Sequence, residues 1–333
     1  MTAGVVIGLT AVIVAADADG PVVLITRKSL DGATAKGLPF GPFAPESHRT
    51  FELALRDFVT AQTGFGVGYV EQLYTFGDRG RDSPLADMGD GAGAGPRVVS
   101  VSYLALAPGR AALSDAGAGW SDWYRFFPWE DWRSGRPALI DTAVAPALTR
   151  WAEAAGNPDR RAARRDRARL AFALDGAPWN EERALDRYEL LYEAGLIAEA
   201  ARDRARAAGG VPRELTLADA DAYGVPMLSD HRRILATAMG RLRAKIKYRP
   251  VIFELLEDRF TLSTLQKVVE GVAGVTLHKQ NFRRLLLQTG MVEGTGVIES
   301  RTGGRPAELF RFRRQALRER PIGGVNVPTP RDR

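Results

Sequence analysis

The hydrophobic positions of about the first 107 residues form strand-like runs around one helical stripe. The runs "VVIGLTAVIVAA" and "PVVLITRK" predict two strands joined by the turn signal "DADG", and "YVEQLYTFGD" and "RVVSVSYLALAP" predict two more. Residues 50–63 predict a helix, because apolar side chains recur at helical spacing and give one face for a sheet: Phe51, Ala54, Leu55, Phe58 and Val59. We therefore expect a mixed α/β domain here, with "RGRDSPLADMGDGAGAGP" as a loop between its last two strands.

The middle of the chain is predicted to be helical. Residues 120–132, "WSDWYRFFPWEDW", hold four of the six tryptophans, which could stack on a base but fit better as a core that joins the domain to its neighbour. Residues 140–225 are rich in Ala and Arg and have helical periodicity. The stretch 160–169, "RRAARRDRAR", could touch phosphates, although alternating Ala and Arg is more typical of a solvated helix face.

From Asp230 onward the pattern predicts helices followed by a hairpin. "HRRILATAMGRLRAKI" predicts a helix that stops before Pro250, and "VIFELL" predicts a second, short one. "TLSTLQKVVEGVAG" and "VTLHKQNFRRLLLQTG" predict two more helices, each ending at a glycine. "GVIESRT" and "AELFRFR" then predict two strands joined by "GGRP". This order is that of a winged helix-turn-helix.

The last predicted helix has a polar face that suits DNA. On residues 278–288, Phe282, Leu285 and Leu286 make a buried stripe. Arginine can pair with guanine, asparagine or glutamine with adenine, and lysine with phosphate. We therefore predict DNA contacts from the other residues of this helix and its N-terminal end: His278, Lys279, Gln280, Asn281, Arg283 and Arg284.

The hairpin tip "RTGGRP" is the second predicted DNA element. Its glycines allow a tight turn, and such a tip commonly places arginine beside or in the minor groove, which assigns Arg301, Thr302 and Arg305 to DNA. The alternatives are a structural or protein-binding winged helix, and RNA. RNA is less favoured because exposed aromatic stacking pairs are missing from this segment.

Composition and charge agree with a two-part protein. Hydrophobic residues make up 45% and charged residues 26%, as in soluble globular proteins. The absence of cysteine excludes disulfides and suits a reducing cytosol, and three separated histidines argue against a zinc site. Residues 229–320 carry 19 Lys/Arg against nine Asp/Glu, whereas residues 1–228 have a net charge of −5, so the basic part is expected to meet a polyanion.

The opening run is expected to be a buried strand. It lacks the basic start of a signal peptide, and Asp17 and Asp19 interrupt it before it could span a bilayer. We therefore predict a cytoplasmic protein with no membrane partner.

Several stretches resemble a known family. "KIKYRPVIFELLEDRFTLSTLQKVVEGVAG", "KQNFRRLLLQTGMVE" and "GGRPAELFRF" resemble the C-terminal domain of the Nudix-related transcriptional regulators of NAD metabolism, the NrtR family. "YVEQLYTFGDRGRD" followed by "VVSVSYLAL" resembles their N-terminal Nudix-like domain, and "LPFGPF" with the Arg/Ala-rich middle resembles the NadQ-like branch. The resemblance covers about two-thirds of the chain and leaves residues 110–228 aside.

The resemblance also implies that metal-dependent hydrolysis is lost. The Nudix motif holds divalent cations through glutamates on a helix. With its final glycine on Gly64, the later glutamate positions fall on Phe58, Ala61 and Gln62, and its arginine on Asp57. The earlier glutamate falls on Arg49, and Glu46 and Glu52 are either vestigial ligands or ordinary surface acids. We therefore predict no catalytic residues, no metal site and no required cofactor.

A cleft without its metal ligands can bind a nucleotide and not cut it. The resemblance implies an effector such as NAD, ADP-ribose or another adenine nucleotide. We assign pyrophosphate contacts to Arg27 and Lys28, and stacking to four aromatic residues, for each of which plain core packing is the alternative: Phe40, Phe43, Tyr74 and Phe76.

These observations predict an α+β architecture in four parts. They are a Nudix-like sensor domain over residues 1–135, a helical linker over 136–228, a winged helix-turn-helix over 229–320 and a tail over 321–333. The predicted function is a homodimeric repressor of NAD-biosynthesis genes that binds a palindromic operator in double-stranded DNA. The alternatives are a Nudix-type hydrolase of a nucleoside diphosphate derivative such as ADP-ribose, and an adaptor whose winged helix binds protein.

Overall fold

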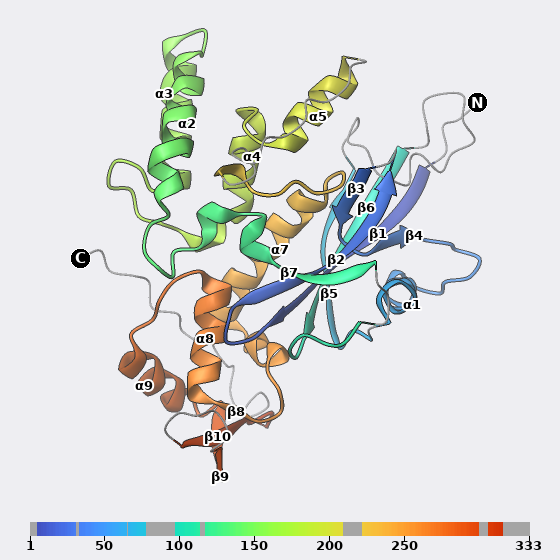
Figure 1. Cartoon of the computed structure of the whole chain (residues 1–333), viewed down its shortest axis with the longest axis vertical. Coiled ribbons are helices and arrows are strands. Elements are labelled where there is room, and N and C mark those ends of the chain that lie inside the picture. Colours follow the sequence, from blue (N-terminus) through green and yellow to red (C-terminus); the bar gives the residue numbers. More distant parts are fainter. Residues whose placement is uncertain are drawn as a thin grey trace.

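The computed structural model describes residues 5–30, 33–64, 66–77, 97–113, 117–208, 222–299 and 306–315. An α/β domain, a helical region and a small C-terminal domain follow one another along the chain (Figure 1). Among the described residues, no helix is both long enough and apolar enough to cross a bilayer.

Seven of the described strands form one mixed sheet: β1 (Val5–Ala16), β2 (Pro21–Leu30), β3 (Ala33–Gly37), β4 (Phe40–Pro42), β5 (Tyr69–Phe76), β6 (Arg97–Ala107) and β7 (Ala118–Asp122). The strand order is β3-β2-β1-β6-β5, with β4 also beside β1 and β7 beside β2. β1 and β6 run parallel, and the other neighbours are antiparallel. The predicted hairpin between β1 and β2 is confirmed, and the two further predicted strands, β5 and β6, pair with each other.

The long apolar runs of the central strands arise because both faces of the sheet are covered. In β1, Leu9 and Ile13 pack on the side of helix α1 (Phe51–Thr63), whereas Val12 and Val14 face the helices on the opposite side. A strand buried on both faces has no polar alternation, which is why β1 reads as a continuous hydrophobic segment.

Helix α1 has the limits and the apolar face that the sequence predicts. The hydroxyl of Thr50 accepts the N–H of Leu53 at 3.2 Å and caps the first turn. Gly64 ends the helix in the left-handed conformation with φ 67°, and its N–H donates to the carbonyl of Thr60 at 2.8 Å. The fully buried members of the stripe are Ala54, Leu55 and Val59.

The helical region contains most of the elements between residues 123 and 207: η2 (Trp123–Arg125), η3 (Pro128–Glu130), η4 (Ile140–Val144), α2 (Ala145–Glu153), α3 (Pro158–Phe172), η5 (Glu181–Arg183), α4 (Ala184–Glu193) and α5 (Ala198–Ala207). The tryptophan-rich segment is core, as predicted: Trp123 and Trp129 are fully buried, and Trp132 stacks on Trp179 at 4.3 Å between ring centroids. Most side chains of α3 are exposed, as expected for a solvated face.

Helix α7 (His231–Tyr248) lies between the sheet and the helical region and packs against both (Figure 1). Its Arg243 is fully buried and shares the carboxylate of Glu130 with Arg187 of α4. Glu130 Oε2 lies 2.5 Å from Arg243 Nη1 and 2.8 Å from Arg187 Nη2. Burial alone would raise the pKa of Glu130, but the two guanidinium groups hold that pKa below its ordinary value. This cluster ties α7 to α4 and to the tryptophan-rich segment.

The C-terminal domain has the predicted winged helix-turn-helix order. It consists of η6 (Val251–Leu255), β8 (Phe260–Thr261), α8 (Leu262–Ala273), α9 (Lys279–Thr289), β9 (Val292–Glu299) and β10 (Ala307–Phe312). The segment "VIFELL" forms a 3-10 helix. The short strand β8 was not predicted, and it pairs with β10 to make a three-stranded sheet.

Candidate DNA interface and ligand sites

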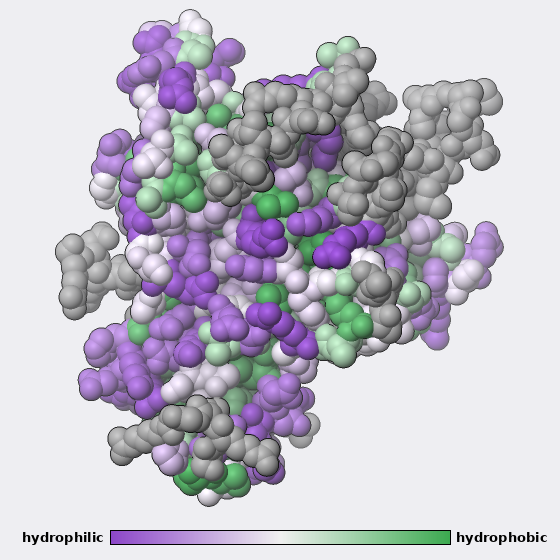
Figure 2. Space-filling model, viewed as in Figure 1, coloured by the Kyte–Doolittle hydropathy of each residue, from purple (hydrophilic) through white to green (hydrophobic). Residues whose placement is uncertain are grey.

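Helix α9 presents a polar face to solvent above a small apolar stripe. Phe282 and Leu286 are each 1% exposed and fix the helix on the domain core, while Leu285 is half-buried. His278, Lys279, Gln280 and Arg284 are exposed around the other side, and the surface over α9 is hydrophilic (Figure 2). The glycine at position 290 ends the helix with φ 65°, a conformation that favours glycine.

Two α9 side chains are already paired with each other on that outer face. Arg284 Nη2 donates to the Oδ1 atom of Asn281 at 2.8 Å. The pair presents donor and acceptor groups side by side, which is the chemistry that reads base edges in a major groove.

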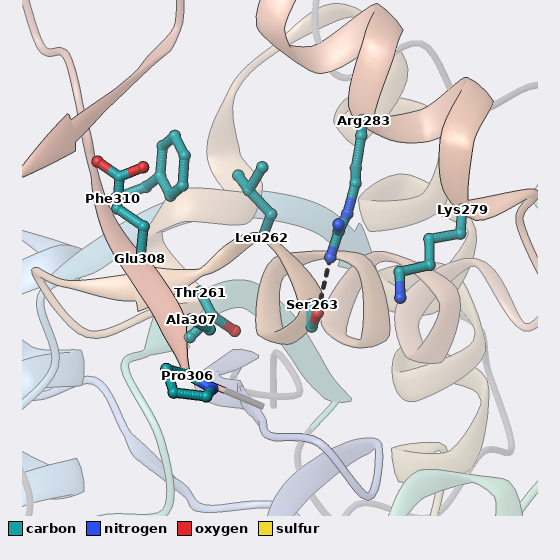
Figure 3. A pocket seen from close by; sticks show the side chains of 9 residues that line it. All are labelled: Thr261, Leu262, Ser263, Lys279, Arg283, Pro306, Ala307, Glu308 and Phe310. Atoms are coloured by element: carbon teal, nitrogen blue, oxygen red, sulfur yellow. Dashed lines mark hydrogen bonds between the residues drawn. The ribbon is translucent and has the colours of Figure 1, made fainter. Parts of the chain in front are cut away.

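Arg283 lies in a different setting, a notch between α8, α9 and β10 (Figure 3). The notch has a volume of about 460 Å³, and its polar lining includes Thr261, Ser263, Lys279 and Glu308. Arg283 Nη2 donates to Ser263 Oγ at 3.0 Å, which aims the guanidinium at the first turn of α8.

The notch has the electrostatic features of a phosphate site. Two cations from α9, Lys279 and Arg283, lie beside the N-terminus of α8. Thr261 caps the first turn of α8, because its Oγ1 accepts the N–H of Thr264 at 3.0 Å. Glu308 at the edge opposes this charge, and its carboxylate accepts the N–H of Gly296 at 3.4 Å. Ser263, the residue that positions Arg283, was not predicted from the sequence.

The tip of the wing lies outside the described residues, and with it Arg301, Thr302 and Arg305. The strands on either side of it are in place: Ala307 of β10 lies opposite Glu299 of β9. The DNA contacts assigned to the tip remain predictions.

In the Nudix-like domain, α1 is the helix that would hold metal ions in a hydrolase, and here its side chains make packing contacts and hydrogen bonds. Gln62 turns inward, where its Nε2 donates to the carbonyl of Phe40 at 2.7 Å and its Oε1 accepts the N–H of Phe40 at 3.3 Å. Asp57 and Ala61 are exposed, and Phe58 packs against Gly41 of β4. The amide at position 62 therefore joins α1 to β4.

The remaining acids of this region do not gather around a common point. Glu52 accepts from Arg56 at 2.8 Å, and the same guanidinium also donates to the carbonyl of Gly68 at 3.1 Å. Glu46 is exposed. The described residues contain no group of three or more His, Asp or Glu side chains that could hold a metal ion.

The predicted stacking residues are divided between separate places. Phe40 is 3% exposed and contacts the ring of His231 edge-on at 5.1 Å, and Phe43 contacts Phe51 edge-on at 4.6 Å. Both have the packing role that the sequence left open as the alternative. Tyr74 and Phe76 instead contact each other at 5.1 Å and line a cavity.

Arg27 lies in a cluster of cations on the sheet. It is directly opposite Lys36 in the ladder between β2 and β3. Burial, followed by the charges of Arg125 and Arg27, lowers the pKa of Lys36. Like charges placed opposite each other are unfavourable, and the pyrophosphate contact assigned to Arg27 stays a prediction. The side chain of Lys28 lies outside the described residues.

The cavity beside Tyr74 and Phe76 has a volume of about 390 Å³ and is completed by α4 and α7. α4 contributes Leu185 and Glu189, and α7 contributes Arg233. None of these three was predicted from the sequence, because their helices fall outside the Nudix-like pattern and only the fold brings them to β5.

The geometry defines the class of the protein as a Nudix-like α/β domain joined through helices to a winged helix-turn-helix. Residues 252–312 match the family model of the NrtR DNA-binding winged helix domain. A curated relative, the ADPR responsive transcriptional repressor NtrR of Acinetobacter baylyi, is 39% identical over 91 residues. The matched region is 27% of this chain and 36% of the relative, so it spans about a third of the relative's length.

Solved structures extend the likeness to the whole fold. NrtR of Shewanella oneidensis, in complex with a 27mer DNA, has a TM-score of 0.54 at 18% identity, covering 96% of this chain and 97% of that one. A MutT/nudix family protein from Enterococcus faecalis has a TM-score of 0.50 at 16% identity, covering 92% and 86%. The chain thus has the NrtR fold and an NrtR-type winged helix, as the resemblance to the NrtR family implied, while the NadQ-like branch stays a prediction.

Proposed function

We propose that this protein is a homodimeric, cytoplasmic transcriptional repressor of NAD-biosynthesis genes that responds to a nucleotide. The observation that carries the proposal is the exposed polar face of α9 within a domain that matches the NrtR DNA-binding family. A two-fold dimer would place two copies of α9 on the halves of a palindromic operator.

On DNA, the two arginines of α9 would have different tasks. The exposed Arg284 and its half-buried partner Asn281 are placed for base edges in the major groove. Arg283 and Lys279, which line the notch at the start of α8, are placed for a backbone phosphate. Arg301 and Arg305 of the wing would add minor-groove or phosphate contacts.

The proposed effector is ADP-ribose, with NAD and other adenine nucleotides as the related candidates. This proposal is supported by the Acinetobacter relative, an ADPR responsive repressor, and by the Nudix-like fold. The positions that would bind metal in a hydrolase carry Phe58, Ala61 and Gln62, so the ligand would be bound without being cut.

The effector can control DNA binding only if it binds two arrangements of the protein with different affinities. A typical coupling of this kind is about 1–3 kcal/mol. In a dimer, a ligand that changes the separation of the two α9 helices would shift operator affinity by that amount.

The test is an electrophoretic mobility shift with the promoter upstream of the protein's own gene cluster, with and without ADP-ribose, NAD or ATP. We expect a retarded complex whose midpoint moves about fivefold or more with one of these nucleotides. A protein that ignores this duplex at low ionic strength would contradict the proposal. Incubation with ADP-ribose and Mg²⁺ in parallel separates the hydrolase alternative, which predicts steady release of product.

A further inference from the structure

The cavity beside β5 brings together three segments that are distant in sequence. The end of β5 contributes Tyr74 and Phe76, α4 contributes Leu185 and Glu189, and α7 contributes Arg233. Its volume of about 390 Å³ is within the usual range for small-molecule sites, roughly 300–1,000 Å³.

An irregularity in β5 places the aromatic pair there. Gln72 lies opposite Tyr103 and Tyr74 lies opposite Ser102, so Leu73 is an extra residue in the strand. Because of this bulge, Tyr74 and Phe76 lie on the same side of the sheet as Leu73, the side that α7 covers. Tyr74 is 59% exposed, which leaves its ring open to a flat ligand.

Arg233 supplies a positive charge in a mostly dry setting. Its side chain is 3% exposed, and its Nη2 donates to Glu189 Oε2 at 2.6 Å. It also lies 3.6 Å from a carboxylate oxygen of Asp230 and 5.1 Å from the ring centroid of Tyr192. The side chain of Glu189 is 37% exposed, so it can leave the pair by rotating into solvent.

A phosphate can take the place of that carboxylate. Both are anions that accept paired hydrogen bonds from a guanidinium group, and a phosphate offers more oxygens and more charge. The cavity therefore combines an aromatic surface with an arginine whose present partner is exchangeable. Flat rings joined to phosphates, as in nucleotides, have this pair of features.

We propose that this cavity is the effector site, in which a nucleotide stacks its base on Tyr74 and Phe76 and places a phosphate at Arg233 in exchange for Glu189. The identity of the ligand rests on the proposed function. The location also gives residues of the helical region a role, because α4 lines the cavity and carries the carboxylate that is displaced.

The site has a direct connection to the DNA-binding domain. Arg233 is in the first turn of α7, which runs to Tyr248, and η6 of the winged helix domain begins at Val251. Exchange of Glu189 for a ligand would loosen α4 from α7 at this end. The same helix that senses the ligand therefore leads into the DNA-binding domain.

The experiment is isothermal titration calorimetry of the full-length protein with ADP-ribose. Tyr74→Ala should weaken binding about tenfold, because one stacked base is lost. Glu189→Gln should tighten binding several-fold, because the competing negative charge is removed while the shape is kept. A merely structural role for Glu189 predicts the opposite direction.

Two matched variants are the controls. Tyr248→Ala removes an equally exposed tyrosine at the far end of α7, and Glu193→Gln neutralises an exposed, ion-paired glutamate one turn along α4. Both should bind like the wild type, and unchanged thermal midpoints show that all four variants are folded. If Tyr74→Ala and Glu189→Gln also bind ADP-ribose within twofold of the wild type, the site is wrong while the proposed function stands. If the wild-type protein binds the promoter but no ADP-ribose, the assigned effector is wrong and this site falls with it.

Discussion

The arginines of α7 and those of α9 have the same chemistry and opposite surroundings. On α7, Arg232 and Arg243 are fully buried and form ion pairs with Glu199 and Glu130. On α9, Arg284 is exposed and its hydrogen bond goes to the uncharged amide of Asn281. The first helix uses its charges to hold the body of the protein together, and the second leaves its charges available to a partner.

Because of this difference, the net charge of residues 229–320 overstates the charge that is available to DNA. Residues 229–320 have 19 basic against nine acidic side chains, but several of these cations are neutralised by acids from the first 228 residues. Besides the two buried arginines, Lys245 pairs with Glu71 and Lys247 pairs with Glu181. The charge that DNA would meet is therefore smaller than the count suggests, and it includes Lys279, Arg283 and Arg284 of α9.

The largest expected effect is on stability, from breaking the buried cluster. Glu130→Gln leaves two buried guanidinium groups without their carboxylate and should lower the free energy of unfolding by about 3–5 kcal/mol. Urea unfolding followed by circular dichroism measures this. Glu52→Gln, which removes an exposed pair with Arg56, is the control and should cost about 0–1 kcal/mol. Equal losses in both variants would contradict the difference between buried and exposed charges.

The same carboxylate predicts a pH dependence. The pKa of Glu130 is lowered in the folded protein, so its contribution to stability is complete above the ordinary glutamate value of about 4.5 and is lost as the pH falls through the lower, folded value. Unfolding free energies measured between neutral and acid pH should therefore decrease less in Glu130→Gln than in the wild type. Parallel pH profiles would count against an ionised Glu130.

The next effect is on sequence recognition by α9. Arg284→Ala should weaken operator binding by about 1–3 kcal/mol if the side chain contacts a base. The matched control is Arg241→Ala, which removes a 43% exposed arginine from α7. Fluorescence anisotropy with a labelled promoter duplex should show almost no change in the control. Equal effects of the two variants would mean that total charge, not the α9 face, determines binding.

A smaller effect is expected where Arg283 holds a phosphate. Arg283→Ala should weaken binding to promoter and scrambled duplexes alike, and the slope of log affinity against log salt should fall by about one. Titrations at several salt concentrations measure the slope. An unchanged slope would remove the notch beside Ser263 from the DNA interface.

The smallest effect concerns the former metal helix. Gln62→Glu restores an acid at a motif position but loses the amide donor to Phe40, so it should cost about 1 kcal/mol of stability. It should produce no hydrolysis of ADP-ribose in Mg²⁺, because Phe58 and Ala61 still supply no carboxylate. Product release by this single variant would show that the site had kept its catalytic geometry.

Local patterns were enough to predict four strands of the large sheet, helix α1 and the order of the C-terminal domain, whereas the short strands β3, β4 and β7 of that sheet were not predicted. The glycine ends of α8 and α9 and the β1–β2 turn are short-range signals, and each is where the sequence places it. The two-residue strand β8 had no such signal, because its pairing with β10 joins residues about fifty positions apart.

The sites were predicted less completely for the same reason. The polar face of α9 follows from helical periodicity alone, so His278 to Arg284 could be named in advance. Ser263 and Arg233 depend on contacts between elements, which no local pattern reveals. Phe40 and Phe43 contact His231 and Phe51, whereas Tyr74 contacts Phe76, and a local pattern does not reveal which of these rings share a cavity.

The most direct measurement is the ratio of dissociation constants for the promoter duplex and a scrambled duplex, determined for the full-length protein with and without ADP-ribose. We expect the promoter to bind at least a thousandfold more tightly, and saturating nucleotide to change that affinity about fivefold or more. Equal affinity for both duplexes, unaffected by nucleotide, would contradict a repressor that reads its operator through α9 and senses a ligand in its Nudix-like half.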